Sequence, residues 1–171
     1  HCMNCQIADY VIEQGSSIFI CGNLTQRVVA EDTEKLIFRI SLMGKYCHKM
    51  HTLSDELEAR YDPHDADFFS EHFKANVENL FAQAVSRQET FRLDRWGHHD
   101  IVSYVVRRAP DLPQRMVLSL LQKAASLHYD FAAWRNSMDN NLLGLVCSMD
   151  YYGSAPRYEV LRFLCNCGID P

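Results

Sequence analysis

The hydrophobic and polar positions of this chain follow the period of an α-helix over most of its length. Segment 32–50, DTEKLIFRISLMGKYCHKM, places apolar residues three or four positions apart after Asp32 and Thr33, two residue types that cap helices. Segment 65–88, DADFFSEHFKANVENLFAQAVSRQ, repeats this spacing and is typical of one long amphipathic helix or two abutting ones. The first half of the chain is therefore predicted to be helical.

The second half has the pattern of two helical hairpins. In the first, HHDIVSYVVRRA leads through PDLP into QRMVLSLLQKAASL, and in the second, NLLGLVCSM leads through YYGSAP into RYEVLRFLCNCG. A proline stands near the start of the second helix in each hairpin, where a helix tolerates it. No low-complexity linker divides the two halves, so we expect one continuous helical body.

Two stretches of the second half resemble each other. DIVSYVVRRAPDL, residues 100–112, lies over EVLRFLCNCGIDP, residues 159–171, with an acidic start, an apolar pair, an aromatic residue and a small residue in matching places. The small residue is Ala109 in the first copy and Gly168 in the second. This overlay predicts that both residues close a helix in a left-handed cap.

The second copy resembles an ankyrin repeat. EVLRFLCNCGIDP is similar to the second helix and Gly-x-Asp-Pro exit of that family, and NNLLGLVCS, residues 140–148, to a degenerate form of its Thr-Pro-Leu-His-x-Ala-Ala opening. Leu143 takes the place of the core leucine. The chain departs from the family at Asn141 and Leu142, where Thr-Pro is expected, and at Gly144, where His is expected. The resemblance covers residues 139–171, with a weaker echo over 98–127.

This resemblance implies an all-α protein with an α-solenoid in its second half. Residues 1–95 are expected to form an irregular helical capping region, and residues 96–171 ankyrin-like helical repeats of a truncated array that continues beyond Pro171. Stacks of this kind present loop tips and a helical face to other proteins. The implied function is an intracellular protein–protein interaction module, a scaffold or targeting subunit within a longer ankyrin-repeat protein.

Composition narrows the choice of partners. The 171 residues carry a net charge of -5, which argues against the basic surface that nucleic-acid binding needs. No apolar run reaches the roughly 18–20 residues of a membrane span. The seven cysteines are odd in number and lie mostly in helix-like runs, which favours a reducing cytoplasmic or nuclear setting. We expect protein partners, and the sequence leaves the oligomeric state open.

Cysteine and histidine pairs in the first half form an alternative, a zinc-stabilised regulatory module. HCMNC supplies Cys2 and Cys5, and YCHKMH supplies Cys47 or His48 together with His51. Two such pairs, brought together by the fold, are what a tetrahedral zinc site requires. The long gap between the pairs is not diagnostic, and partly buried thiols and surface histidines are the preferred explanation of these residues. Our first expectation is a protein without a cofactor, with zinc as the alternative.

A divergent Cys-His enzyme is the second alternative. It would need a thiolate activated by a neighbouring base, and no family signature surrounds any cysteine. The sequence contains no Gly-rich phosphate loop, no Gly-x-Ser-x-Gly and no His-Glu-x-x-His. Catalytic residues are therefore not assigned, and we expect a protein that is not an enzyme.

Aromatic and arginine side chains are the candidate partner-binding residues, because interfaces are enriched in both. All of them lie in loops or at helix ends of the second half, where they can equally cover the core or suit the helix dipole. The set is Trp96, Arg107, Arg108, Trp134, Tyr151 and Tyr152.

Overall fold

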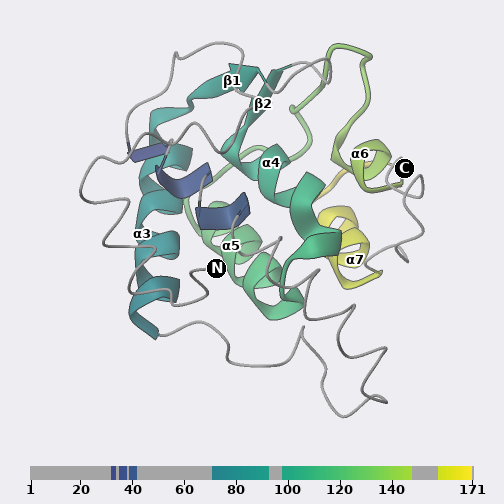
Figure 1. Ribbon diagram of the computed structural model, residues 1–171. Helices are drawn as coiled ribbons and strands as arrows, with labels where there is room; N and C mark the ends of the chain where they lie inside the picture. Colours follow the sequence, from purple (N-terminus) through teal and green to yellow (C-terminus); the bar gives the residue numbers. More distant parts are fainter. Residues whose placement is uncertain are drawn as a thin grey trace, which may run out of the picture.

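The computed structural model describes residues 32–33, 35–37, 39–41, 71–92, 98–147 and 158–170. The described residues of 32–41 are helical, as predicted. The labelled elements that follow are α3 (Glu71–Arg87), β1 (Thr90–Arg92), β2 (His98–Asp100), α4 (Ile101–Arg108), the 3₁₀-helix η3 (Ala109–Asp111), α5 (Gln114–Ser126), α6 (Leu142–Cys147) and α7 (Tyr158–Asn166). The fold is mostly helical, in agreement with the sequence (Figure 1).

The expectation of an all-α chain is wrong in one place. Strands β1 and β2 form an antiparallel hairpin in which Thr90 pairs with Asp100, Phe91 with His99 and Arg92 with His98. Each strand has only three residues, too few for a period of two to stand out in the sequence. Phe91 and His99 are nonetheless buried, so the hairpin lays one central pair of side chains on the core.

Helix α4 lies at the centre of the molecule. Residues 101–106, IVSYVV, are all buried, as expected for a helix that is apolar on nearly every side. The helix contacts α3, α5 and α6, and its Tyr104 ring forms a T-shaped pair with Phe91 of the hairpin at a centroid distance of 5.9 Å. One hydrophobic core therefore runs from Leu36, Ile37 and Ile40 through α3, α4 and α5 to α6 and α7.

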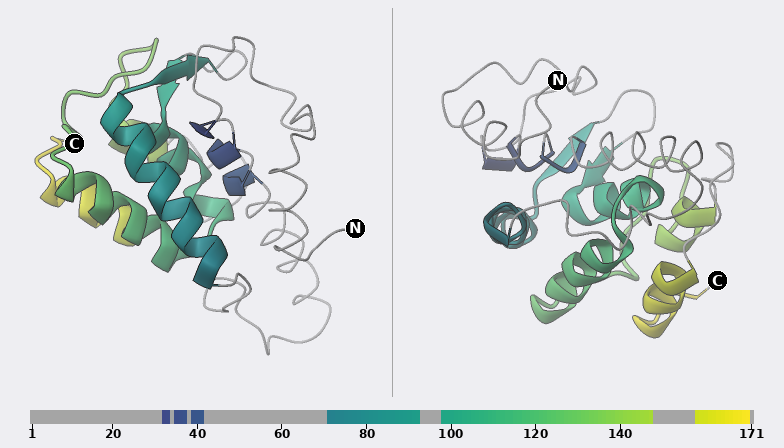
Figure 2. Two further views of the ribbon diagram at one scale, coloured as in Figure 1. Left: turned by 90° about the vertical axis from the view of Figure 1, so that its left-hand side faces the viewer. Right: turned by 60° about the horizontal axis from the view of Figure 1, so that its bottom comes forward.

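The described helices from α4 onward form two pairs with matching contacts. Within the pairs, α4 packs on α5 and α6 on α7, and between the pairs, α4 packs on α6 and α5 on α7. The right view of Figure 2 shows α5 and α7 side by side. Helix α4 thus corresponds to α6 and α5 to α7, so the sequence overlay of segment 100–112 on segment 159–171 matched a first helix with a second one.

The ends of the helices repeat as well. At the start of each first helix an Asx side chain accepts a backbone N–H three residues on: Ser103 to Asp100 at 2.8 Å, and Gly144 to Asn141 at 2.8 Å. After each second helix one residue turns left-handed, His128 at φ 59° and Gly168 at φ 80°. The prediction of a left-handed cap is confirmed at Gly168.

The same prediction is wrong at Ala109, whose φ of -51° is that of a right-handed helix. Ala109 continues α4 into the 3₁₀-turn Ala109–Asp111, with Pro110 at a position where a helix start accepts proline. The left-handed exit of the first pair comes at His128, after α5.

The predicted division of the chain at residue 95 falls between the two paired strands. Described residues on both sides contribute to the one core, since α3 packs on both α4 and α5. Residues 1–31 and most of 32–70 lie outside the described part, so the irregular capping region stays a prediction. Within the described residues, no helix has the length and apolar character of a membrane span.

Replacing Gly168 by alanine tests the left-handed exit. A Cβ at this position would meet no atom within 4 Å, so the cost comes from the backbone alone. We expect Gly168→Ala to lower the free energy of unfolding by about 1 kcal/mol, measured by urea denaturation. Gly168→Asn should lose less, because asparagine tolerates this conformation. Equal stability of the alanine variant and the wild type would contradict a left-handed cap in solution.

Candidate functional site

A hollow of about 430 Å³ opens where three elements meet: the carboxyl end of α3, the hairpin, and the loop 127–141 that follows α5, here called the exit loop. In Figure 1 and in the left view of Figure 2, the hairpin and the exit loop extend from the same end of the molecule. Side chains that line the hollow include Glu89, Asp100, Leu127, Tyr129, Asp130 and Trp134.

Side-chain hydrogen bonds hold the exit loop in shape. Asp130 Oδ1 accepts the backbone N–H groups of Ala132 and Ala133 at 3.1 and 3.0 Å, forming a turn directly after the left-handed His128. Further on, Asn136 Oδ1 accepts the N–H groups of Met138 and Asn140, both at 2.9 Å. The backbone that carries Trp134 is therefore bracketed by two fixed turns.

A polar network that includes the buried side chains of His99 and Ser103 lies between the hairpin and α4, and its member Asp100 lines the hollow. Asp100 caps α4, and the Ser103 side chain reaches back to the Asp100 backbone N–H at 3.0 Å, so the two residues form a capping box. The Ser103 hydroxyl donates to the Asp100 carbonyl oxygen at 3.1 Å, and its oxygen also meets His99 Nδ1 at 3.2 Å. Ser103 is fully buried with every hydrogen-bonding position of its hydroxyl in use.

The tautomer of His99 follows from its neighbours. Arg107 Nη1 lies 3.4 Å from His99 Nε2, and a guanidinium can only donate, so Nε2 is the acceptor. Nδ1 therefore carries the proton and donates it to Ser103. The imidazole is 1% exposed, and the Trp134 indole stacks on it with ring centroids 6.0 Å apart and an interplanar angle of 30°. His99 thus connects Trp134 to Arg107.

Tyr129 closes the network from the exit loop. Its hydroxyl donates to Asp100 Oδ2 at 2.5 Å, while its ring meets Phe131 edge-on at a centroid distance of 4.9 Å. Burial, followed by the negative charge of Asp100 and its hydrogen bond and then by the charge of Asp130, raises the pKa of Tyr129 well above its ordinary value. The phenol therefore keeps its proton and acts as a donor, and the electrostatic potential around its oxygen is negative.

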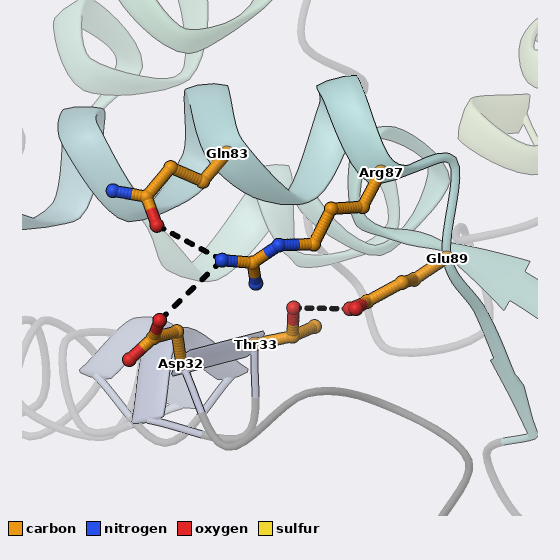
Figure 3. Close-up of polar contacts among 5 residues, drawn as sticks. All are labelled: Asp32, Thr33, Gln83, Arg87 and Glu89. Carbon is orange, nitrogen blue, oxygen red and sulfur yellow. Dashed lines mark hydrogen bonds and ion pairs between the residues drawn. The ribbon is translucent and has the colours of Figure 1, made fainter.

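Figure 3 shows a second polar cluster at the carboxyl end of α3, which includes Glu89, one of the residues that line the hollow. Arg87, in the last turn of α3, donates to Gln83 Oε1 at 3.0 Å and pairs with Asp32 at 3.4 Å. The buried Thr33 hydroxyl donates to the Glu89 carboxylate. These contacts link the described helical residues 32–33 to the carboxyl end of α3 and hold Glu89 where it lines the hollow.

The structure brings two of the predicted partner-binding residues together. Trp134 lines the hollow. Arg107 does not line it, but it contacts His99, the residue on which Trp134 stacks. Arg108 forms an ion pair with Asp111 at 3.2 Å across the end of α4 and does not line the hollow. The remaining candidates, Trp96, Tyr151 and Tyr152, lie outside the described residues.

Several residues of the site were missed by sequence reasoning. Glu89, Asp100, Tyr129 and Asp130 stand on separate elements, and no local pattern joins them. One signal was present: Asp100 precedes an apolar run and is followed three positions later by Ser103, which is the spacing of a helix cap.

The predicted zinc ligands Cys2, Cys5, Cys47, His48 and His51 all lie outside the described residues. Among the residues that the structure does describe, no three His, Cys, Asp or Glu side chains converge as metal ligands would. Cys147 and Cys165 are exposed, and Cys167 is partly buried. Burial raises the pKa of the Cys167 thiol, the opposite direction from an activated nucleophile.

No family model matches the chain, and no curated protein or solved structure matches it either. The assignment of a function therefore depends on the geometry of the chain itself.

Replacing Tyr129 by phenylalanine tests its bond to Asp100. We expect Tyr129→Phe to lower the free energy of unfolding by about 1.5–3 kcal/mol at neutral pH, because the bond joins a half-buried carboxylate. The folded-state pKa is raised, so this contribution is present below the ordinary tyrosine pKa of about 10 and is lost as the pH rises above it. The stability gap between the two proteins should therefore narrow above pH 10.

The control for this experiment is Tyr158→Phe, at a tyrosine that is 72% exposed. It should leave both the stability and its alkaline slope unchanged, as measured by urea denaturation at a series of pH values. A gap between wild type and Tyr129→Phe that stays constant above pH 10 would contradict the raised pKa.

Proposed function

We propose that this chain is a protein-recognition module built on a short ankyrin-like stack of helical pairs. The observation that carries the proposal is the repeated arrangement of α4–α5 and α6–α7. The two pairs share their contacts, their Asx caps and their left-handed exits. Repeated pairs that bury a continuous core through contacts with their neighbours are the basis of solenoid proteins, whose usual role is to bind other proteins.

The local chemistry supports the resemblance where the sequence departs from the family. Asn141 stands in place of the expected Thr, and its side chain both caps α6 and donates from Nδ2 to the Asp170 carbonyl oxygen at 3.1 Å. In the first pair, Asp100 caps α4 and accepts from Tyr129 beyond α5. In both pairs the cap residue of the first helix is bonded to the exit of the second.

The spacing of the pairs also supports a proposal for where the binding surface lies. Equivalent residues recur about every 40 positions, about seven more than the roughly 33 of an ankyrin repeat, and the exit loop 127–141 is the longest connection between the labelled elements. In repeat proteins such additions gather on one face, which is often the face that binds partners. Of the three large apolar side chains that are exposed in the described part of the chain, Leu127 and Met138 lie on this loop.

Capture of binding partners with matched variants tests the proposal. Wild-type protein, the double variant Leu127→Ser/Met138→Ser, and Tyr158→Ser are each immobilised and exposed to a cell extract. Tyr158→Ser removes an exposed apolar residue from α7, outside the exit loop. We expect a saturable partner that is retained by wild type and Tyr158→Ser and lost by the loop variant, with equal circular dichroism for all three. No saturable partner, or equal capture by all three, would refute the module or its surface.

A further inference from the structure

The hollow beside the exit loop has the size and shape to receive one long side chain. Its volume of about 430 Å³ is at the small end of the range for ligand sites. Trp134 is half-buried in its wall, and because the indole already stacks on His99, only its remaining surface is available to a ligand. A flat aromatic surface beside a concavity favours a planar or cationic group.

The formal charges of the residues that line the hollow are all negative. Glu89, Asp100 and Asp130 contribute carboxylates, and the described lining residues contain neither Lys nor Arg. Arg135, on the same loop, donates to the carbonyl oxygens of Ala132 and Trp134 and does not line the hollow. The hollow therefore presents negative charge next to an indole.

Internal hydrogen bonds hold these carboxylates in place. Asp130 is fixed by two backbone N–H groups, Asp100 by Ser103 and Tyr129, and Glu89 by Thr33. Preorganised charges of this kind do not need to be reordered when a cation binds. The raised pKa of Tyr129, caused in part by Asp100 and Asp130, is a second sign of the negative field in this region.

The spacing of the acids distinguishes between kinds of cation. Three carboxylates that served a metal ion would converge on one point, and among the described residues no such group exists. Carboxylates spread around an aromatic ring suit a larger organic cation instead. Of the two basic side chains, arginine is the better fit, because its planar guanidinium stacks on indole and donates in several directions at once.

We propose that this hollow binds an arginine side chain of the partner protein. This inference rests on the proposed function and specifies the chemistry of its partner. The guanidinium lies against the exposed surface of Trp134, with its N–H groups directed toward the carboxylates of the rim.

The probe is a short acetylated peptide of alternating arginine and glycine, titrated into the full chain at pH 8. The control probe is the same peptide with citrulline, which keeps the shape and removes the charge. Binding is followed by the indole N–H resonance of Trp134, assigned with Trp134→Phe. We expect saturable binding of the arginine peptide and at least roughly tenfold weaker binding of its citrulline counterpart.

Isosteric variants test which carboxylates contribute to the binding of the arginine peptide. Asp130→Asn and Glu89→Gln keep the oxygen acceptors that the loop and Thr33 use, and remove one charge each; together they should weaken arginine binding roughly fivefold. Asp139→Asn removes the same charge from the exit loop outside the lining and should change nothing. Equal binding of the citrulline or a lysine peptide, or an equal effect of Asp139→Asn, would overturn the assignment of an arginine site.

The outcome is separable from that of the proposed function. If the Leu127→Ser/Met138→Ser variant loses its partner while the arginine peptide fails to bind, the recognition surface stands and the arginine site is wrong. If the peptide binds as expected but no partner is captured, the cation site stands and the proposed module is wrong.

Discussion

Replacement of Phe81 by alanine is expected to lower the free energy of unfolding by about 3–5 kcal/mol. Phe81 lies on α3 and is fully buried in the core that α3 shares with α4 and α5. Truncation leaves a cavity that the surrounding helices can close only in part. This loss is a large fraction of the roughly 5–15 kcal/mol by which a typical domain is stable.

The same experiment decides whether the chain divides near residue 95. Both of its tryptophans, Trp96 and Trp134, lie after that point, so their fluorescence reports on the second half alone. If α3 and the helical pairs unfold together, Phe81→Ala shifts the urea midpoints of fluorescence and of far-ultraviolet circular dichroism by the same amount. A fluorescence midpoint that stays in place while the circular dichroism changes would establish a separate first domain.

Two further variants keep this prediction testable if the alanine variant fails to fold. Phe81→Leu retains most of the volume and should cost less than about 1.5 kcal/mol. Asn79→Ala changes an exposed residue of the same helix and should stay within about 0.5 kcal/mol of the wild type. A coupled fluorescence shift with Phe81→Leu and none with Asn79→Ala supports the single core.

The helices were predictable because each has a face or a whole surface of apolar residues at a regular period. Segment 65–88 contains α3 and segment 114–127 contains α5, while Gly168 marks the exit of α7 as a glycine should. The left-handed exit at His128 was not predicted, because histidine, unlike glycine, does not indicate a positive φ in a sequence. The overlay of the two sequence segments matched Gly168 with another small residue, and it therefore placed the first exit at Ala109 instead of His128.

The hairpin and the site could not be predicted from the sequence for a different reason. Phe91 and His99 face the core from strands of three residues, and only their pairing makes a sheet. Trp134 was predictable as a large aromatic in a loop, whereas its environment was not. Glu89, Asp100 and Asp130 look like ordinary helix-end and turn residues, and their common field arises only when α3, the hairpin and the exit loop meet.

Replacement of Asp100 by alanine is the second large effect that we expect, about 2–4 kcal/mol lost from the free energy of unfolding. Asp100 has two structural roles. Its Oδ1 caps α4 through the Ser103 N–H, and removal of an Asx cap costs about 1 kcal/mol. Its Oδ2 accepts from Tyr129, and a hydroxyl left without a partner in a largely buried place costs about 1–3 kcal/mol more.

Asn141→Ala is the matched control, because Asn141 caps α6 in the same way at the equivalent position of the second pair. It should cost about 1 kcal/mol, the value of the cap with one weak side-chain bond to Asp170. Asp100→Asn keeps an oxygen for the Ser103 N–H and should fall between the two. Urea denaturation of all three variants at pH 7 provides the comparison.

A double-mutant cycle separates the two roles of Asp100. If the bond to Tyr129 accounts for the excess over a simple cap, Tyr129→Phe should cost much less in the Asp100→Ala background than in the wild type. Additive losses, or an Asp100→Ala variant no less stable than Asn141→Ala, would mean that Asp100 is only a helix cap. The exit loop would then be held by the turns at Asp130 and Asn136 and by its packed aromatic side chains, with no measurable contribution from the bond between Asp100 and Tyr129.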